Sequence, residues 1–244
     1  MNEKINLARE FIESSDNIVF LGGAGVSTAS GIPDFRSATG LYNRAHNANY
    51  SPEYLLSYDY FKADPKGFYT YLRENLYYPD AQPNAAHYAL AKLEKLGKLK
   101  AVITQNIDNF HQRAGSSNVL ELHGTMEHYY CIRCHKDYDV TYVMRTKEVP
   151  LCTCGGIVRP DVVLYGEMLN TDVLNASIKA ITRADMFIIG GTSLVVYPAA
   201  ALVRYYRGDK LLLINQDPTA YDNWANLVIA GDISQVMASL VEDL

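Results

Sequence analysis

Cysteine and basic charge are both scarce in this 244-residue chain. It has 4 cysteines, all between Cys131 and Cys154, whereas a disulfide framework would distribute them over the fold. Lys and Arg number 22 against 27 Asp and Glu, which gives a formal net charge of −5. This balance argues against a surface that follows nucleic-acid phosphates or an anionic membrane. We therefore expect a cytoplasmic protein that binds metal through cysteine and has neither nucleic acid nor membrane among its partners.

Long uninterrupted apolar runs are also lacking. The N-terminal residues have the pattern of an amphipathic helix and no apolar core of a signal peptide. The uncharged stretch 186–203 approaches the length of a membrane span, but glycines and Pro198 divide it into strand, loop and helix. With 48% hydrophobic and 20% charged residues, the composition is typical of a folded protein with a sizeable core.

Short apolar segments alternate with amphipathic ones along the chain. The spacing predicts helices and strands in alternation at 3–15, 18–21, 84–96, 100–104, 170–181, 186–189, 197–206, 211–214 and 233–240. Strands that are apolar throughout and alternate with helices indicate a parallel sheet covered on both faces. The predicted fold class is therefore α/β, with a doubly wound parallel sheet.

Two stretches interrupt this alternation. Residues 37–78 are rich in tyrosine, and residues 123–160 hold all the cysteines. We predict that these insertions form a smaller domain above the edge of the sheet where ligands bind in such folds. The larger domain is then expected to comprise 1–36, 79–122 and 161–244.

Glycines directly follow the first predicted strand, in the segment Gly22–Thr28. Glycine at this place lets backbone N–H groups approach a pyrophosphate. The dinucleotide fingerprint is incomplete because Thr28 stands where a third glycine is expected, so a tight turn without a ligand stays an alternative. The nearby Asp34, Phe35 and Arg36 suit a charged ligand with a planar ring, although a surface Asp–Arg pair would explain two of them.

Polar side chains also follow the later strands. Gln105, Asn106 and Asp108 come after the strand at 100–104, and a helix cap explains one of them but not the set. His123 follows a further strand, and histidine is suited to proton abstraction near neutral pH, with a structural histidine as the alternative. A second strand-to-loop glycine turn spans 190–198, so two such turns could hold the two halves of a dinucleotide, with a structural turn as the alternative for either one alone.

The cysteines form two closely spaced pairs, Cys131 with Cys134 and Cys152 with Cys154. Four thiolates can close a tetrahedral zinc site and leave no position for water. The sequence therefore predicts one structural zinc ion rather than a catalytic one.

In this order, the motifs GAGVSxxSGIPDFR, TQNID, HG, CxxC with CxC, GTSLVVYP and a late Asn resemble the sirtuin family of NAD-dependent protein lysine deacylases. The resemblance runs from about residue 5 to residue 240, and it is strongest to bacterial members of the deacetylase type. It implies a Rossmann-like NAD domain, a small domain with structural zinc, and an acyl-lysine tunnel between them.

The resemblance also implies roles for individual residues. Phe35 is expected near the nicotinamide, and Asn106 and Asp108 near its ribose and carboxamide. Thr192, Ser193, Asn215 and Ile233 are expected to hold the adenosine half. The full set implied for NAD is Gly23, Ala24, Thr28, Asp34, Phe35, Arg36, Gln105, Asn106, Ile107, Asp108, His123, Gly191, Thr192, Ser193, Asn215 and Ile233.

By the same resemblance, His123 is the general base of a deacetylation that requires no zinc chemistry. The acyl oxygen attacks C1′ of the nicotinamide ribose, nicotinamide leaves, and His123 deprotonates the ribose hydroxyls. Free lysine, nicotinamide and O-acetyl-ADP-ribose are the implied products.

The implied partners are acetylated-lysine proteins or peptides. Two segments, 163–166 and 191–196, are similar to the edges between which the family pairs an extended peptide, with contacts at Val163, Tyr165, Gly166 and Val195. Pairing through the main chain reads little sequence, so we expect broad tolerance of the peptide.

One departure concerns the acyl group. Relatives that remove succinyl or malonyl groups carry Tyr and Arg three residues apart, whereas here Tyr69 is followed at that spacing by Leu72. Arg73 points about 100° away on a helix. This predicts deacetylation and poor removal of acidic acyl groups, with longer apolar acyl groups left open.

Three other functions stay open. A mono-ADP-ribosyltransferase would differ only in where the ADP-ribose is attached. A hydride-transferring enzyme would share the nucleotide site, but no residue set for its substrate is evident. A non-enzymatic NAD-sensing zinc-ribbon interaction module would leave the 105–108 motif and His123 without a purpose.

Overall fold

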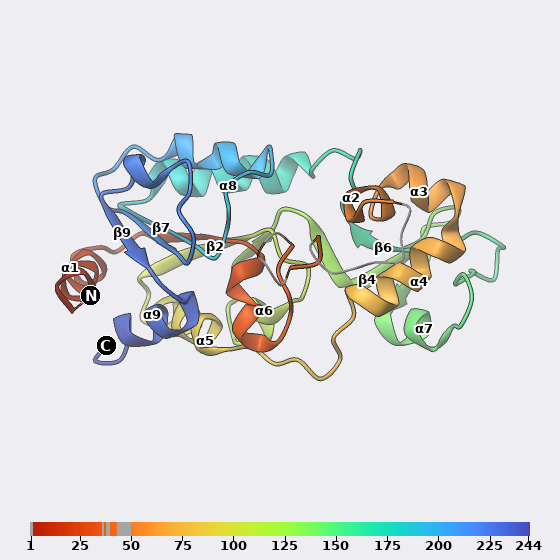
Figure 1. Cartoon of the computed structure of the whole chain (residues 1–244), viewed down its shortest axis with the longest axis horizontal. Helices are drawn as coiled ribbons and strands as arrows, with labels where there is room; N and C mark the ends of the chain where they lie inside the picture. The colour runs from red at the N-terminus through yellow and green to blue at the C-terminus, as the bar shows by residue number, and fades with distance from the viewer. Residues whose placement is uncertain (1, 36, 38–39, 43–49) are drawn as a thin grey trace.

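A six-stranded parallel sheet forms the larger half of the molecule in the computed structural model, which describes residues 2–35, 37, 40–42 and 50–244 (Figure 1). Every neighbouring pair of its strands is parallel. β1 and β7 are buried along their whole length, as expected for strands covered on both faces. The predicted α/β fold class is confirmed. In spatial order the strands are β3 (Val119–Glu121), β2 (Leu99–Thr104), β1 (Ile18–Gly22), β7 (Met186–Gly190), β8 (Leu211–Asn215) and β9 (Leu227–Ala230).

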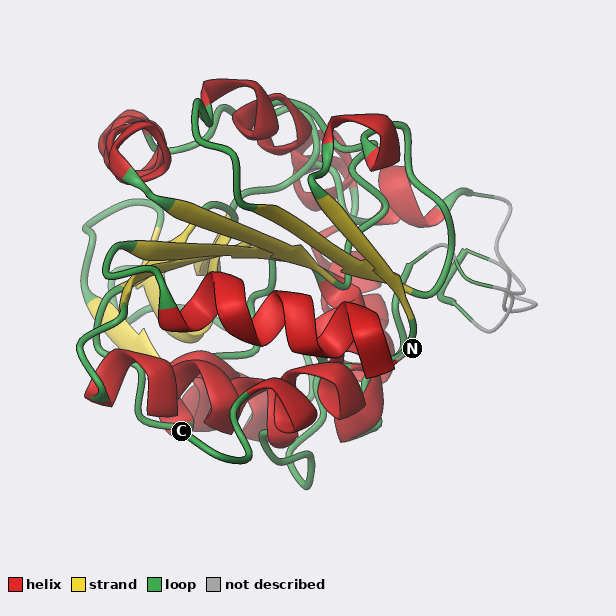
Figure 2. Cartoon of the chain, turned by 90° about the vertical axis from the view of Figure 1, so that its left-hand side faces the viewer, coloured by secondary structure: helices red, strands yellow, loops and turns green. Residues whose placement is uncertain are grey.

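Helices cover both faces of this sheet (Figure 2). On one face, apolar side chains of three helices join those of the strands in a single core: α1 (Asn2–Glu13), α5 (Ala85–Lys95) and α9 (Ile233–Leu240). The other face packs against α8 (Thr171–Arg183) and η3 (Ala199–Tyr205). Among the described residues, the helices are all too short or too polar to cross a membrane.

One predicted helical segment and the turn after β1 have 3₁₀ geometry. The segment predicted at 197–206 forms η3, where Ala199 and Leu202, and Ala200 and Val203, are buried three residues apart. Side chains at this spacing eclipse one another in a 3₁₀-helix, so the burial pattern favours the tighter winding. The turn after β1 continues into η1 (Ala24–Val26) and η2 (Thr28–Ser30).

The smaller half has its own sheet and its own core. Its three antiparallel strands lie in the order β5 (Asp137–Asp139), β4 (Gly124–Cys131) and β6 (Val158–Val162). Helices of the other insertion pack on this side of the molecule, so segments far apart in the sequence meet here (Figure 1). β6 extends across the predicted boundary at residue 160, and the domain boundaries stay a prediction. The helices of this half are α2 (Pro52–Leu55), α3 (Tyr58–Ala63), α4 (Pro65–Asn75) and α7 (Val140–Arg145).

Candidate functional site

A cavity of about 610 Å³ lies where the carboxyl ends of the parallel strands face the smaller half. All six strands contribute to its lining. The chain runs outward from β1 to β3 on one side and from β7 to β9 on the other, so the strand order reverses between β1 and β7. Ligands of open α/β sheets bind at such a reversal. The lining residues that end or directly follow the strands are Gly23, Gln105, His123, Gly191, Asn215 and Gly231.

Most residues predicted for the site line this cavity. For the NAD set, Arg36 lies outside the described residues, and every other member lines it: Gly23, Ala24, Thr28, Asp34, Phe35, Gln105, Asn106, Ile107, Asp108, His123, Gly191, Thr192, Ser193, Asn215 and Ile233. For the peptide set, Val163, Tyr165 and Gly166 line it. Val195 is outside the lining, and its side chain is 53% exposed.

The two glycine turns touch each other at the reversal of strand order. The Gly25 N–H donates to the Gly191 carbonyl oxygen at 2.8 Å. A Cβ on Gly25 would lie 2.8 Å from the Cα of Gly191, which itself has a left-handed φ of +58°. The chain continues into η1, where the Val26 N–H donates to the Gly23 carbonyl at 2.9 Å. Glycine is therefore required for the backbones to approach this closely.

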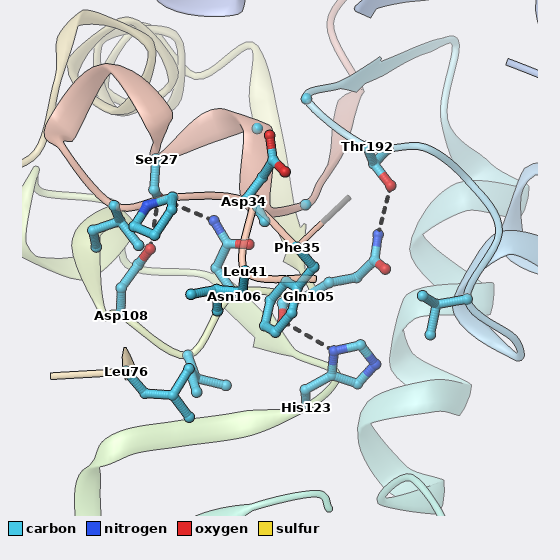
Figure 3. A pocket seen from close by; sticks show the side chains of 18 of the residues that line it. Ser27, Asp34, Phe35, Leu41, Leu76, Gln105, Asn106, Asp108, His123 and Thr192 are labelled. Carbon is cyan, nitrogen blue, oxygen red and sulfur yellow. Dashed lines mark hydrogen bonds between the residues drawn. The ribbon is translucent and has the colours of Figure 1, made fainter. Parts of the chain in front are cut away.

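A chain of hydrogen bonds links the first turn to the polar motif after β2 (Figure 3). The Asn106 amide donates to the Ser27 hydroxyl at 3.1 Å, and that hydroxyl donates to the Asp108 carboxylate at 2.6 Å. The N–H of Phe110, the first residue of α6 (Phe110–Arg113), donates to the other carboxylate oxygen at 3.0 Å. Burial raises the pKa of Asp108, and these hydrogen bonds oppose part of that effect.

A second link crosses the cavity floor. The Gln105 side-chain amide donates to the Thr192 hydroxyl at 3.1 Å, which joins the end of β2 to the turn after β7. Both links hold polar side chains of different strands in fixed positions before any ligand arrives, which is how a preorganised site is built.

His123 is held in one tautomer by the main chain. Its Nδ1 lies 2.9 Å from the Gln105 carbonyl oxygen (Figure 3). A carbonyl oxygen only accepts, so Nδ1 carries the proton and Nε2 of the neutral ring is left as a proton acceptor. Burial lowers the pKa of His123, and the hydrogen bond to Gln105 opposes part of that effect. The imidazole is therefore neutral at neutral pH and can serve as a base.

The part of the cavity nearest the smaller half is apolar. The predicted difference from relatives that remove succinyl or malonyl groups concerns this wall. Leu72 lines the cavity, whereas Tyr69 and Arg73 do not. The Tyr69 hydroxyl donates to the Val158 carbonyl, and the Arg73 guanidinium donates to the Glu148 carbonyl at 2.8 Å. The apolar lining comprises Leu56, Phe68, Leu72, Leu76, Ile107, Met126 and Val162.

The four cysteines converge outside the cavity. Their sulfur atoms all lie within 4.8 Å of one another, and two pairs, Cys131 with Cys154 and Cys134 with Cys152, are 3.5 Å apart. A tetrahedral zinc ion with Zn–S bonds of about 2.3 Å would place its sulfur ligands about 3.8 Å apart. The cluster therefore fits such an ion despite the shortened second pair.

Sequence analysis missed several polar residues of the cavity. Ser27 stands within the quoted glycine motif, and its hydroxyl in a ligand-binding turn could have identified it. Asp217 and Asp232 also line the cavity, at the ends of β8 and β9. Asp217 closely follows the strand predicted at 211–214, a position that indicated it, whereas no pattern in the sequence distinguished Asp232 from an ordinary loop residue.

Comparison with known proteins then identifies the family. A match described as the Sir2 family spans residues 23–198. The chain belongs to the Sir2 family. Among relatives of this Sir2 chain, a protein of Clostridium perfringens (strain 13 / Type A) named NAD-dependent protein deacetylase is 54% identical over 244 residues, covering 99% of this chain and 100% of the relative. A Staphylococcus aureus (strain Mu50 / ATCC 700699) protein of the same name is 45% identical and covers 100% of both chains.

Solved structures agree with the Sir2 assignment over the whole chain. One described as "Structural Basis for the Mechanism and Regulation of Sir2 Enzymes" matches with a TM-score of 0.90 and 42% identity, covering 99% of this chain and 98% of that one. Another, described as "Sir2 bound to acetylated peptide", matches with a TM-score of 0.84 and 39% identity, covering 98% of both chains. The resemblance to sirtuins stated from the motifs is confirmed.

Proposed function

We propose that this protein is an NAD-dependent protein lysine deacetylase that transfers the acetyl group of lysine to ADP-ribose, consumes one water molecule, and releases free lysine, nicotinamide and O-acetyl-ADP-ribose. The observation that carries the proposal is His123, a half-buried neutral imidazole held by the Gln105 carbonyl in a cavity that joins two glycine turns to an apolar wall. Relatives at 54% and 45% identity named as NAD-dependent protein deacetylases support it.

The cavity residues fit NAD. The touching glycine turns at Gly25 and Gly191 expose main chain of the kind that approaches a pyrophosphate. Asn215 ends β8 on the side proposed for the adenosine half, and Phe35 lies on the side proposed for the nicotinamide. When bound, NAD supplies a cationic leaving group and an electrophilic ribose carbon.

The remaining chemistry falls to residues of this chain. The Ser27–Asp108 hydrogen bond and the Gln105–Thr192 hydrogen bond fix the polar walls, so that reactants are positioned rather than activated. His123 accepts a ribose hydroxyl proton at Nε2, because its Nδ1 proton is retained by the Gln105 carbonyl. The apolar wall that includes Leu72 surrounds the acyl chain and excludes water.

Acetylated-lysine peptides are the proposed partners, and zinc the proposed structural ion. The segment 163–166 lines the cavity beside the apolar wall, where a peptide could place its acyl-lysine. Zinc is proposed on the convergence of four cysteine sulfur atoms. The domain boundaries given above and a cytoplasmic location belong to the same proposal.

The test is mass spectrometry of an acetyl-lysine peptide incubated with the protein, with and without NAD, beside the His123→Ala variant. We expect NAD-dependent loss of the acetyl group with release of nicotinamide and O-acetyl-ADP-ribose. The variant should be slower by about 10²- to 10⁴-fold, the range for loss of a general base. His135→Ala, which removes an exposed histidine outside the cavity, is the matched control and should retain activity. NAD consumption with a peptide that stays acetylated would point instead to ADP-ribosyl transfer.

A further inference from the structure

We propose that Asn84 is a positioning residue for the dinucleotide. Its side-chain amide holds the turn after β1 in the conformation that binds NAD, and it thereby lowers the dissociation constant of a ligand that it does not itself contact. Asn84 stands outside the cavity lining, directly before α5. This inference rests on the proposed function, since it takes the cavity as the NAD site.

The Asn84 amide reaches two points of the turn. Its Nδ2 donates to the Val26 carbonyl at 2.8 Å and to the Ser30 hydroxyl at 2.9 Å. Val26 belongs to η1 and Ser30 to η2, so one amide group spans both short helices. Ser27 and Thr28, which line the cavity, lie between these two contacts. The positions of these two residues therefore depend on a group outside the site.

The turn has little support of its own. η1 and η2 have three residues each, and hydrogen bonds of 3₁₀-helices have poorer geometry than those of α-helices. Gly31, which ends η2, has a φ of +86°, and a glycine constrains the chain beyond it only weakly. The contact of Gly25 with Gly191 fixes the beginning of the turn, and the Asn84 amide fixes its end.

Asn84 is itself held on a rigid support. It is the N-cap of α5: its Oδ1 accepts from the Ala86 N–H at 3.0 Å, and its own N–H donates to Nδ1 of His87 at 3.2 Å. His87 is fully buried, and the apolar side chains of α5 belong to the core on one face of the large sheet. The two ends of one amide thus have different tasks, because the oxygen caps α5 and the nitrogen holds the turn.

The first turn of α5 also supports the residue that Ser27 binds. The His87 ring meets that of Phe110 edge to face, with centroids 5.6 Å apart. The Phe110 N–H donates to one oxygen of Asp108, and the Ser27 hydroxyl donates to the other. Both partners of the Ser27–Asp108 hydrogen bond therefore rest on the N-terminus of α5. A displaced turn would break this bond in the cavity wall.

Loss of the amide nitrogen should weaken NAD binding more than it slows the reaction. The apparent affinity falls with the fraction of molecules that keep the binding conformation, and two neutral hydrogen bonds limit the loss to about 30-fold. At saturating NAD the ligand restores the turn, so kcat should change by less than about 3-fold. A merely structural role would reduce the amount of active protein, and with it kcat, without changing the dissociation constant.

The experiment compares Asn84→Ser with the wild type. Titration calorimetry gives the dissociation constant of ADP-ribose, and deacetylation of a peptide over a range of NAD concentrations gives KM and kcat. Serine keeps the helix cap but carries no amide nitrogen. The dissociation constant of ADP-ribose and KM for NAD should both rise about 5- to 30-fold. Asn84→Asp also keeps the cap, and it should raise both constants because a carboxylate cannot donate to the Val26 carbonyl.

The matched control is Asn170→Ser. Asn170 is the N-cap of α8, where its side chain accepts from the N–H groups of Asp172 and Val173 outside the cavity lining. This variant should keep the wild-type dissociation constant. Ser30→Ala removes one of the two acceptors of the Asn84 amide, so it should have a smaller effect than Asn84→Ser. The double variant should match Asn84→Ser alone, since both changes remove the same bond.

The positioning role is overturned if Asn84→Ser binds ADP-ribose as tightly as the wild type, or if its defect is confined to kcat. It is also overturned if only the aspartate variant is affected, or if the double variant shows the product of the two single effects. Failure of the proposed function has a different signature, namely a wild-type protein that binds no ADP-ribose and leaves the peptide acetylated.

Discussion

The two halves of the molecule are stabilised in different ways. In the larger half, strands such as β1 and β7 are buried along their whole length between two layers of helices, and apolar side chains make up both cores. In the smaller half, one core includes Cys131 and Cys152 beside Tyr69 and Tyr129. The larger half therefore depends on apolar burial, whereas the smaller half also depends on groups that need a metal ion or a hydrogen-bond partner.

This difference matches the division of work in the site. Gln105 directly follows β2, Ser27 lies in the turn after β1, and His123 lies two residues beyond β3, so the parallel sheet of the larger half positions all three. The smaller half supplies the apolar wall and anchors the segment that includes Tyr165. The groups proposed to react are thus positioned by the sheet of the larger half, and the proposed acyl wall belongs mainly to the half that holds the cysteine cluster.

Removing the metal should produce the largest difference in stability between the two halves. Chelation, or the Cys131→Ser variant, should unfold the smaller half, because four thiolates left without their ion cannot hold the loops around β4 together. Deacetylation should fall by about 100-fold or more, since the wall and the peptide segment are lost together. Hydrogen exchange followed by mass spectrometry should show lost protection in β4 and β6 and retained protection in β1, β2, β7 and β8.

Thr141→Ala, which changes an exposed residue of α7 in the same half and no cysteine, is the matched control and should keep both activity and protection. A zinc-depleted protein that stays protected in β4 and remains active would show that the smaller half is as independent of metal as the larger one.

A cation in the apolar wall should change which acyl group is accepted. Leu72→Arg places a guanidinium at a position that is 1% exposed and lines the cavity. Burying this charge beside an acetyl group is unfavourable, whereas a succinyl carboxylate can pair with it. The ratio of kcat/KM for acetyl-lysine to that for succinyl-lysine should fall by about 100-fold, measured on peptides of one sequence.

Leu72→Met keeps the volume and the apolar character, so it should preserve the wild-type ratio. Efficient desuccinylation by the wild type, or an unchanged ratio in the arginine variant, would show that the wall does not select the acyl group.

The same contrast explains how far the sequence could predict this structure. Apolar runs such as 186–189 predicted the four central strands β2, β1, β7 and β8, because strands covered on both faces are buried at nearly every position. The edge strand β9 was not predicted, and it is only partly buried. The strand β4 was not predicted because its register is irregular between Thr125 and Tyr129, so that Met126 and Tyr129, three residues apart, are both buried. Ordinary alternation is broken there, and the polar residues between them conceal the strand.

The candidate site divides in a similar way. Residues in motifs directly after strands, such as Gln105 and Asn215, were predicted because the carboxyl ends of parallel strands meet at one edge. The hydrogen bond between the hydroxyls of Tyr42 and Tyr165 joins segments more than a hundred residues apart, and the 19 tyrosines of the chain offer no local pattern that selects these two. Such contacts depend on how the two halves pack, which spacing along the sequence does not encode.

Acid should affect the two halves with opposite signs. In the larger half, His87 and His111 are buried with ring centroids 4.8 Å apart, and burial lowers the pKa of His87 to about 4 and that of His111 to about 3. Unfolded histidines titrate near 6.5, so between pH 6.5 and about 4 the unfolded chain binds more protons than the folded one. Stability should therefore fall as pH falls through this window, by up to about 1.4 kcal/mol per pH unit for each histidine.

In the smaller half, burial alone would lower the pKa of His128, but hydrogen bonds and charge from Asp137 and Asp161 outweigh it and raise that pKa. Its contribution is present in full below the unfolded pKa and is lost as pH rises through the folded one. The ring nitrogens of His111 have no hydrogen-bond partner among the described residues, so phenylalanine can replace this histidine without breaking a hydrogen bond. The melting temperature of His111→Phe, measured between pH 4.5 and 8, should therefore depend less on acid than that of the wild type. The His128→Gln variant should lower the melting temperature more at pH 5 than at pH 8. If both variants shift the profile in the same direction, the two halves do not differ in how they hold their histidines, because opposite pKa shifts require opposite slopes.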